Sequence, residues 1–164
     1  MPNILARPLA VCLLASLATP AMAGPTLGLG STSEGTGALD LGYDWTFELS
    51  HYHPALDLRL GTGFILFEGD ERSDNQAFYV RPALRYSWEH VFVEGGIGAS
   101  GFVDTHIEDR DLGSAFQFED RLALGVRMGV YGDLSVSITH YSNASIKEPN
   151  DGFELYGLNW RLAY

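Results

Sequence analysis

Apolar and polar residues alternate along most of this 164-residue chain, and this period of two constrains the fold more than any other feature. Successive side chains of a β-strand point to opposite faces, so the alternation predicts strands that each have one apolar face. The clearest run ends the chain, with Tyr156, Leu158, Trp160, Leu162 and Tyr164 on one parity and Asn159 and Arg161 on the other. The chain is therefore expected to be all-β.

Eight such runs predict strands over 25–33, 37–48, 54–67, 76–88, 90–103, 114–128, 131–142 and 152–164. An even number of strands of about ten residues each is what a closed membrane barrel needs. Closure leaves no backbone N–H or C=O group unpaired in lipid. The apolar face is also dense and rich in aromatic residues where the runs end. We therefore expect an eight-stranded antiparallel transmembrane β-barrel, with a periplasmic β-sandwich as the alternative.

The first 23 residues predict a secretory signal peptide rather than a part of the fold. Arg7 supplies the positive charge, an apolar stretch of about ten residues follows over 9–18, and Ala21-Met22-Ala23 is an A-x-A cleavage site. The apolar stretch is too short to span a bilayer as a helix. Residues 24–164 are then expected to form one barrel domain in the bacterial outer membrane.

Composition excludes several classes of function. The net charge is −11, and an acidic chain without a cluster of Lys or Arg is not expected to bind nucleic acid. The single cysteine, Cys12, lies within the predicted signal peptide, so neither a disulfide framework nor a multi-cysteine metal site is expected. No His and carboxylate residues recur at the spacing of metal ligands, and we expect no cofactor.

The lengths of the links predict the orientation of the barrel. Links after odd-numbered strands are expected to be surface loops, and links after even-numbered strands to be short periplasmic turns. Segments 88–90 and 128–131 are short, whereas 68–75, 104–113 and 143–151 are longer and polar. Both ends of the barrel should therefore lie in the periplasm, with the last of these loops at the cell surface.

Three polar residues occupy lipid-facing positions beside that last loop. The outward parity of the seventh strand continues to His140 and Ser142, and that of the eighth strand, followed back from its end, reaches Glu154. If His140 pairs with Glu154, then Ser142 pairs with Gly152, and the three side chains lie within reach of one another. Asp120 also falls on the apolar parity of its strand, and the pattern leaves open whether a bulge re-aims it.

Two interpretations of these three residues remain open from the pattern alone. A carboxylate, an imidazole and a hydroxyl in that order are what activates a serine nucleophile. The same residue types are also ordinary near a bilayer interface, where a polar side chain costs little. In that case Glu154 and the acidic loops would bind divalent cations that bridge lipopolysaccharide phosphates, and the barrel would have a structural or adhesive role.

The stretch 138–154, ITHYSNASIKEPNDGFE, resembles the lipid A 3-O-deacylase (PagL) family. The family's signature is matched by His140-Tyr141-Ser142-Asn143-Ala144, Lys147, Pro149-Asn150-Asp151-Gly152 and Glu154. Further matches lie upstream at Glu94-Gly95-Gly96-Ile97-Gly98, Leu112-Gly113-Ser114 and Phe118-Glu119-Asp120-Arg121. The similarity is strong over 90–164. Ser145 is a departure, because some members have Gly at that position.

This resemblance implies an eight-stranded outer-membrane barrel. It also implies a serine esterase that removes the 3-hydroxyacyl chain from position 3 of lipid A, so that lipopolysaccharide of the outer leaflet is its partner. The family's roles pass to Ser142 as nucleophile, His140 as general base and Glu154 as the group that orients the base. No metal is required.

The resemblance also indicates residues for the oxyanion. Asn150 matches the family's donor, and the backbone N–H groups near Ala144 and Ser145 are candidate co-donors. Asn143 is a candidate for orienting the hairpin or for assisting at the oxyanion. An outer-membrane esterase of different lipid specificity and a non-catalytic barrel remain the alternatives, and either a monomer or a homodimer is compatible with the sequence.

Overall fold

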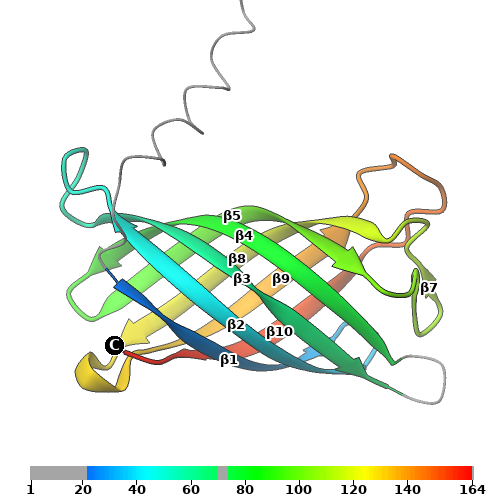
Figure 1. Cartoon of the computed structure of the whole chain (residues 1–164), viewed down its shortest axis with the longest axis horizontal. Coiled ribbons are helices and arrows are strands. Elements are labelled where there is room, and N and C mark those ends of the chain that lie inside the picture. The colour runs from blue at the N-terminus through cyan, green and yellow to red at the C-terminus, as the bar shows by residue number, and fades with distance from the viewer. Residues whose placement is uncertain (1–21, 70–73, 164) are drawn as a thin grey trace, which may run out of the picture.

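The structure is a closed antiparallel β-barrel of eight strands (Figure 1). It is a computed structural model that describes residues 22–69 and 74–163. The barrel strands are β1 (Met22–Thr32), β2 (Gly37–Glu48), β3 (Leu56–Glu68), β4 (Asn75–Trp88), β5 (Val91–Phe102), β8 (Phe116–Arg127), β9 (Asp133–Ser142) and β10 (Phe153–Arg161). Each strand pairs with the next around the barrel, and β1 pairs with β10 to close it. The predicted fold class is confirmed.

All eight predicted strands form, with ends within three residues of those expected. The largest shift at a strand start is in β1, which begins at Met22 because that residue already pairs with Thr46 of β2. Before β9, Gly129–Tyr131 form a 3₁₀ turn instead of extending the strand. The predicted signal peptide lies outside the described residues except for its last two residues, and Tyr164 lies outside them too. Cleavage after Ala23 stays a prediction.

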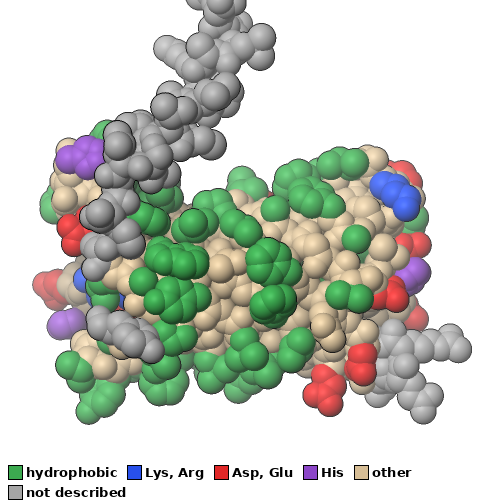
Figure 2. Space-filling model, in the orientation of Figure 1, with side chains coloured by type: hydrophobic (Ala, Val, Ile, Leu, Met, Phe, Trp, Pro, Cys, Tyr) green, Lys and Arg blue, Asp and Glu red, His purple; other side chains and the backbone are tan. Residues whose placement is uncertain are grey.

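No helix in the described part of the chain is both long enough and apolar enough to cross a membrane. The strands, by contrast, carry an apolar outer wall and a polar interior. Outward-facing Ile97 and Leu29 are 67% and 60% exposed, whereas the inward-facing carboxylate residue Glu119 is 0% exposed. Figure 2 shows apolar side chains spread along the barrel wall and charged side chains gathered at its two ends. This arrangement needs a non-aqueous medium around the wall, which excludes the sandwich alternative.

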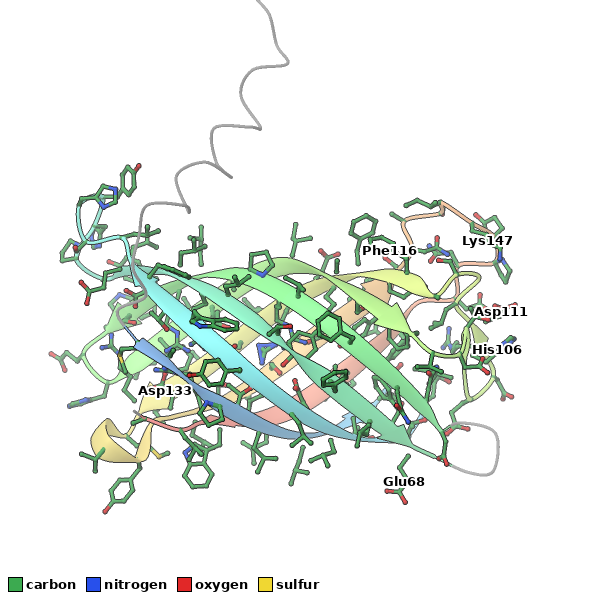
Figure 3. All side chains as sticks on the ribbon, viewed as in Figure 1. Glu68, His106, Asp111, Phe116, Asp133 and Lys147 are labelled. Atoms are coloured by element: carbon green, nitrogen blue, oxygen red, sulfur yellow. The ribbon has the colours of Figure 1, made fainter. Side chains whose placement is uncertain are left out.

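The links gather at two distinct ends of the barrel (Figure 1). The links that follow β1, β3, β5 and β9 lie at one end, which we call the loop end. The links that follow β2, β4 and β8 lie at the other, the turn end, together with the start of β1 and the end of β10. Figure 3 shows His106, Asp111 and Lys147 at the loop end and Asp133 near the turn end.

The link between β5 and β8 contains a small hairpin that the alternation did not predict. Its strands are β6 (His106–Ile107) and β7 (Arg110–Asp111). Two-residue strands are too short to show a period of two. Ile107 and Leu112 are both 0% exposed, so the hairpin packs down onto the mouth of the barrel and does not extend freely into solvent.

Apolar side chains fill the lumen beneath this hairpin. The buried cluster comprises Ile65, Phe67, Ala77, Tyr79, Phe102, Ile107, Leu112, Tyr141, Phe153 and Leu155. The rings of Tyr141 and Phe153 stack with their centroids 4.8 Å apart. These two residues lie on β9 and β10. The cluster therefore packs against the inner face of the β9–β10 hairpin, whose outer face carries the predicted site residues.

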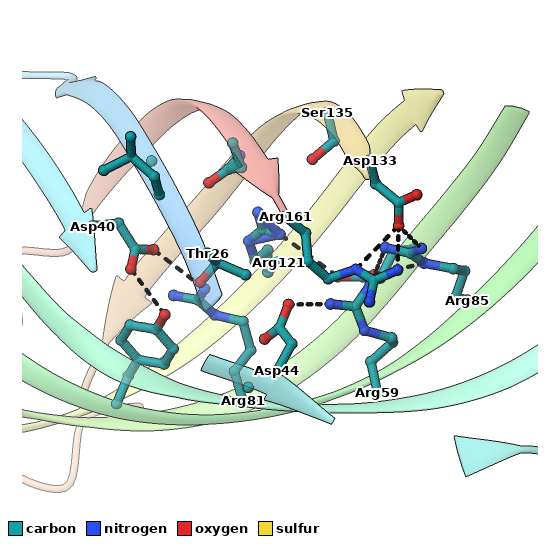
Figure 4. Close-up of a pocket in the computed structure, with 16 residues that line it drawn as sticks. Thr26, Asp40, Asp44, Arg59, Arg81, Arg85, Arg121, Asp133, Ser135 and Arg161 are labelled. Atoms are coloured by element: carbon teal, nitrogen blue, oxygen red, sulfur yellow. Dashed lines mark hydrogen bonds and ion pairs between the residues drawn. The ribbon is translucent and has the colours of Figure 1, made fainter. Parts of the chain in front are cut away.

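Paired charges fill the lumen nearer the turn end (Figure 4). Asp133 of β9 accepts hydrogen bonds from Arg85 of β4, at 2.5 Å, and from Arg161 of β10, at 2.9 Å. Arg81 pairs with Glu119 at 2.8 Å. The space left between these groups is about 40 Å³, which is room for only a few water molecules. The lumen is therefore a cross-linked core and not a channel.

Asp133→Asn is expected to destabilise the barrel strongly, because two buried guanidinium groups would lose their shared carboxylate. Breaking a buried pair from one side costs about 3–5 kcal/mol. The measurement is semi-native gel electrophoresis of samples heated to a series of temperatures, which gives the temperature at which the band of the folded barrel is lost. Asp57→Asn is the matched control, since Asp57 also faces the lumen but is only half-buried and makes no ion pair with the described residues. An equal loss of thermal stability in the two variants would contradict the role of Asp133 as the shared partner of two buried guanidinium groups.

Candidate active site

The β9–β10 hairpin brings His140 and Glu154 together as the sequence predicted. The two residues are directly opposite in the antiparallel ladder. Nδ1 of His140 lies 3.1 Å from Oε1 of Glu154. Because a carboxylate only accepts hydrogen bonds, the neutral imidazole carries its proton on Nδ1 and has its lone pair on Nε2. Both side chains remain partly exposed on the outer wall, at 43% and 37%, so the free nitrogen is available to a group outside the barrel.

Ser142 lies two residues along the same strand and on the same outer face as His140. The ladder between β9 and β10 ends at the pair Tyr141–Phe153, so the expected further pair of Ser142 with Gly152 does not form. A side chain at Gly152 would press on Cε1 of His140 at 2.9 Å and approach Nε2 at 3.4 Å. The Cε1–Nε2 edge of the imidazole therefore lies beside Gly152, at the end of the ladder where Ser142 also lies.

No hydrogen bond joins Ser142 to His140 among the described residues. In ligand-free hydrolases the contact between nucleophile and base is commonly loose, and it tightens when substrate binds. Of the two contacts expected in the triad, the structure therefore forms the one between His140 and Glu154. Ser142 lies near this pair on the same outer face. The nearest ladder partner of Ser142 is Phe118 of β8.

The backbone of Glu154 is held by the turn between β1 and β2. The N–H of Ser33 donates to the carbonyl of Glu154 at 2.8 Å, and the N–H of Glu154 donates to Oγ of Ser33 at 3.3 Å. This contact extends the closing seam of the barrel by one residue past the ladder pair Thr32–Leu155. The carboxylate that orients His140 is therefore fixed to the first turn of the chain.

Asp120 of β8 completes a polar row across three strands. It sits opposite His140 in the ladder between β8 and β9 and opposite Ile97 on its other side. The ladder is regular at this point, so no bulge re-aims the side chain, which stays exposed on the outer wall. The parity of the sequence already placed Asp120 there, but only the register shows that two carboxylates flank the same imidazole.

The loop over 143–152, which we call the catalytic loop, buries Asn143 completely at 0% exposure. The side-chain amide of Asn143 donates to the carbonyl of Leu112 at 2.8 Å and to that of Lys147 at 2.7 Å. Both amide hydrogens are therefore used within the protein. Of the two roles that the sequence left open for Asn143, this geometry favours the orientation of the hairpin.

Asn150 lies near the other end of the catalytic loop and bonds back to the start of that loop. Its Oδ1 accepts a hydrogen bond from the backbone N–H of Asn143 at 2.8 Å. Since an N–H group can bond only to the oxygen of the amide, the orientation of Asn150 is determined, and its Nδ2 points away as a donor. Asn150 is half-buried, so this donor is available to a ligand.

Ala144 and Ser145 form a tight turn with positive φ at both positions, 54° and 57°. The N–H of Ile146 donates to the carbonyl of Asn143 at 3.1 Å and closes the turn. This is the geometry of a type I′ turn, in which Gly or Asn is preferred. It explains why Gly is a natural residue at position 145. The N–H groups of Ala144 and Ser145 make no hydrogen bonds with other described residues.

An apolar groove runs along the outer wall from the His140–Glu154 pair toward the middle of the barrel. It has a volume of about 690 Å³ and is lined by Val93, Leu122, Ala123, Leu124, Val136, Ser137, Ile138, Tyr156, Gly157 and Leu158. The cross-strand pair Ile138–Tyr156 is the next outward-facing pair below His140–Glu154, so the groove begins directly beneath the polar row. Its shape and lining suit a hydrocarbon chain.

Among the described residues, no group of three or more His, Cys, Asp or Glu side chains is arranged to hold a metal ion. The chemistry that the geometry offers is that of an oriented imidazole beside a serine, at the head of an apolar groove.

Comparison with known proteins assigns the chain to a family. The model of the lipid A 3-O-deacylase (PagL) family matches residues 27–163. The chain belongs to this family.

Two relatives carry the same name. The chain is 31% identical over 142 residues to lipid A deacylase PagL of Pseudomonas aeruginosa, with 82% of each chain covered. It is 32% identical over 164 residues to lipid A deacylase PagL of Bordetella bronchiseptica, with 92% of each covered. The crystal structure of the outer membrane enzyme PagL superimposes with a TM-score of 0.76 at 30% identity, covering 85% of this chain and 99% of that one. Membership of the PagL family makes the chain an outer-membrane esterase.

Ser145→Gly is expected to stabilise the protein by about 1 kcal/mol or less, because it relieves a left-handed backbone conformation that costs a side chain about 1–2 kcal/mol. The measurement is the thermal midpoint of the purified barrel in detergent. Ser50→Gly is the matched control, because Ser50 is also exposed in a link but has no positive φ. The control should lose stability, and a loss in both variants would contradict the argument.

Proposed function

We propose that this protein is a serine esterase that hydrolyses the ester at position 3 of lipid A and releases a 3-hydroxy fatty acid. The observation that carries the proposal is the His140–Glu154 pair beside Ser142 on the outer wall, at the head of an apolar groove. Membership of the PagL family supports the choice of substrate.

The first half of the reaction forms an acyl-enzyme. Nε2 of His140 takes the proton of Ser142, and Oγ attacks the carbonyl carbon of the ester. The tetrahedral intermediate collapses when His140 returns that proton to the oxygen of the sugar, which leaves. Glu154 holds the imidazole in the required tautomer and stabilises its cationic form. The fatty acid is then bound to Ser142 through an ester.

The second half releases the fatty acid. A water molecule gives a proton to Nε2 of His140 and attacks the acyl carbonyl. The second intermediate collapses when His140 returns that proton to Oγ of Ser142, which leaves and regenerates the free serine. The negative oxygen of each intermediate is assigned to Nδ2 of Asn150, with the N–H groups of Ala144 and Ser145 as co-donors. Loss of one such donor lowers kcat by a factor of about 10²–10³ in a known hydrolase.

The position of the site suits a substrate that is itself part of the membrane. The acyl chains of lipid A lie parallel to the barrel wall, and the groove that Ile138 and Tyr156 help to line offers one of them an apolar surface. The polar row lies at the loop end of that groove, where the ester meets the sugar headgroup. An enclosed pocket is unnecessary because the bilayer itself excludes water from the acyl chain.

Ser142→Ala is expected to abolish deacylation, with a fall in rate by a factor on the order of 10⁴ or more. The measurement is mass spectrometry of lipid A from cells that express the wild type or the variant. The wild type should remove the mass of one 3-hydroxyacyl chain, and fragmentation should locate the loss at position 3. Ser31→Ala is the matched control, because Ser31 is another exposed serine on the outer wall and should leave activity unchanged.

The same experiment separates the alternatives. Unchanged lipid A from a folded wild-type barrel, together with release of fatty acid from purified phospholipid, would assign the site to another ester. Deacylation that persists in Ser142→Ala would exclude this serine as the nucleophile. Activity on neither lipid would favour the alternative of a non-catalytic barrel with a structural or adhesive role.

A further inference from the structure

Three segments at the loop end form one connected structure over the mouth of the barrel. They are the turn over 33–36, the link over 103–115, which we call the surface hairpin, and the catalytic loop. Thr36 donates to Glu108 at 2.7 Å, and Arg110 pairs with Glu34 at 2.7 Å. This bond to Glu34 raises the pKa of Arg110 above its ordinary value. The surface hairpin is therefore tied to the turn that holds Glu154.

The surface hairpin also packs closely against the catalytic loop. The N–H of Asp151 donates to the carbonyl of Asp111 at 3.1 Å. Gly113 has a φ of 68°, and a Cβ at that position would collide with the carbonyl oxygen of Pro149. The closest bond across this contact is the one from the buried amide of Asn143 to the carbonyl of Leu112, at 2.8 Å. Leu112 is itself fully buried in the apolar cluster.

Asn143 connects the surface hairpin to Asn150, the candidate oxyanion donor. Its side chain is clamped between the carbonyls of Leu112 and Lys147, and its backbone N–H bonds to Oδ1 of Asn150. If the clamp opens, the backbone N–H turns and Asn150 loses the bond that aims its Nδ2. A continuous chain of contacts therefore runs from the apolar cluster to the group that would face the reacting oxygen.

We propose that Asn143 is a positioning residue, whose buried amide uses the surface hairpin as a fixed support and thereby aims Asn150 at the developing oxyanion. The proposal rests on the proposed esterase function. It assigns to the surface hairpin a catalytic purpose beyond covering the lumen. Asn143 itself does not touch the substrate, since its side chain is completely buried.

Asn143→Asp is the informative variant because it keeps the shape of the side chain and removes both amide hydrogens. A carboxylate would then face two carbonyl oxygens, and the clamp would open. The measurement is steady-state hydrolysis of lipid A in detergent by the purified barrel. We expect kcat to fall by a factor of about 10–10², as for a misplaced catalytic group, with KM changed less than about twofold because the groove is untouched.

A double-mutant cycle distinguishes positioning from a general loss of order. Asn150→Ala should lower kcat by a factor of about 10²–10³. If Asn143 acts through Asn150, then adding Asn143→Asp to Asn150→Ala should cost nothing further. Multiplied effects in the double variant would overturn the proposal. Asn143→Ala is the second variant in case the carboxylate prevents folding, since the carbonyl of Leu112 keeps its bond from Gln117 at 3.2 Å.

Asn75→Asp is the matched control. Asn75 is also buried, at 5% exposure, and its amide also donates to two carbonyls of the surface hairpin, those of Asp104 and His106. Among the described residues, Asn75 makes no side-chain hydrogen bond to the catalytic loop. We expect a comparable fall in thermal midpoint but kcat within about threefold of the wild type, because aiming of Asn150 is retained. An equal loss of kcat in both variants would overturn the proposal.

A readout without turnover keeps this proposal separate from the proposed function. The side-chain amide of Asn150 can be followed by ¹⁵N NMR in detergent micelles. We expect its resonance to shift and to report faster motion in Asn143→Asp but not in Asn75→Asp. An inactive wild type with this NMR result would remove the esterase function and leave the clamp in place, whereas an unchanged Asn150 resonance would remove the clamp.

Discussion

The hydrocarbon of the bilayer cannot hydrogen-bond to a protein, and most of this structure follows from that constraint. Backbone groups must pair with other backbone groups, so the sheet closes on itself through β1 and β10. Charged side chains must face one another, so they fill the lumen as paired groups around Asp133 and Glu119. What remains for the outside is an apolar wall. A polar row on that wall is therefore the exception, and it requires a reason beyond folding.

The strands that carry the polar row also carry part of the apolar cluster, because successive residues alternate between the faces. Tyr141 lies between His140 and Ser142 in the chain and points inward. Phe153 precedes Glu154, and its ring stacks on the ring of Tyr141. The stacked rings thus hold the same hairpin whose outer face presents the site. Packing inside the barrel and chemistry outside it are consequently coupled through neighbouring residues of two strands.

The alternation predicted the eight strands and the pairing of His140 with Glu154, because both depend on local periodicity and on one short hairpin. It also placed Asp120 on the outer wall. It missed the surface hairpin, whose strands are too short for a pattern and whose order depends on contacts with distant segments. One of the two partners of the Asn143 amide is a carbonyl 31 residues away, and the position of a backbone carbonyl cannot be read from a sequence. The start of β1 depended likewise on pairing with β2.

The groove on the outer wall has a consequence for how such an enzyme meets its substrate. A site that opens sideways into the leaflet is reached by lateral diffusion in two dimensions, and the released fatty acid returns to the same leaflet. The relevant concentration is then the mole fraction of lipid A in the surface and not its amount per litre. Detergent that dilutes lipid A within a micelle would lower the encounter rate even when the total quantity of lipid is constant.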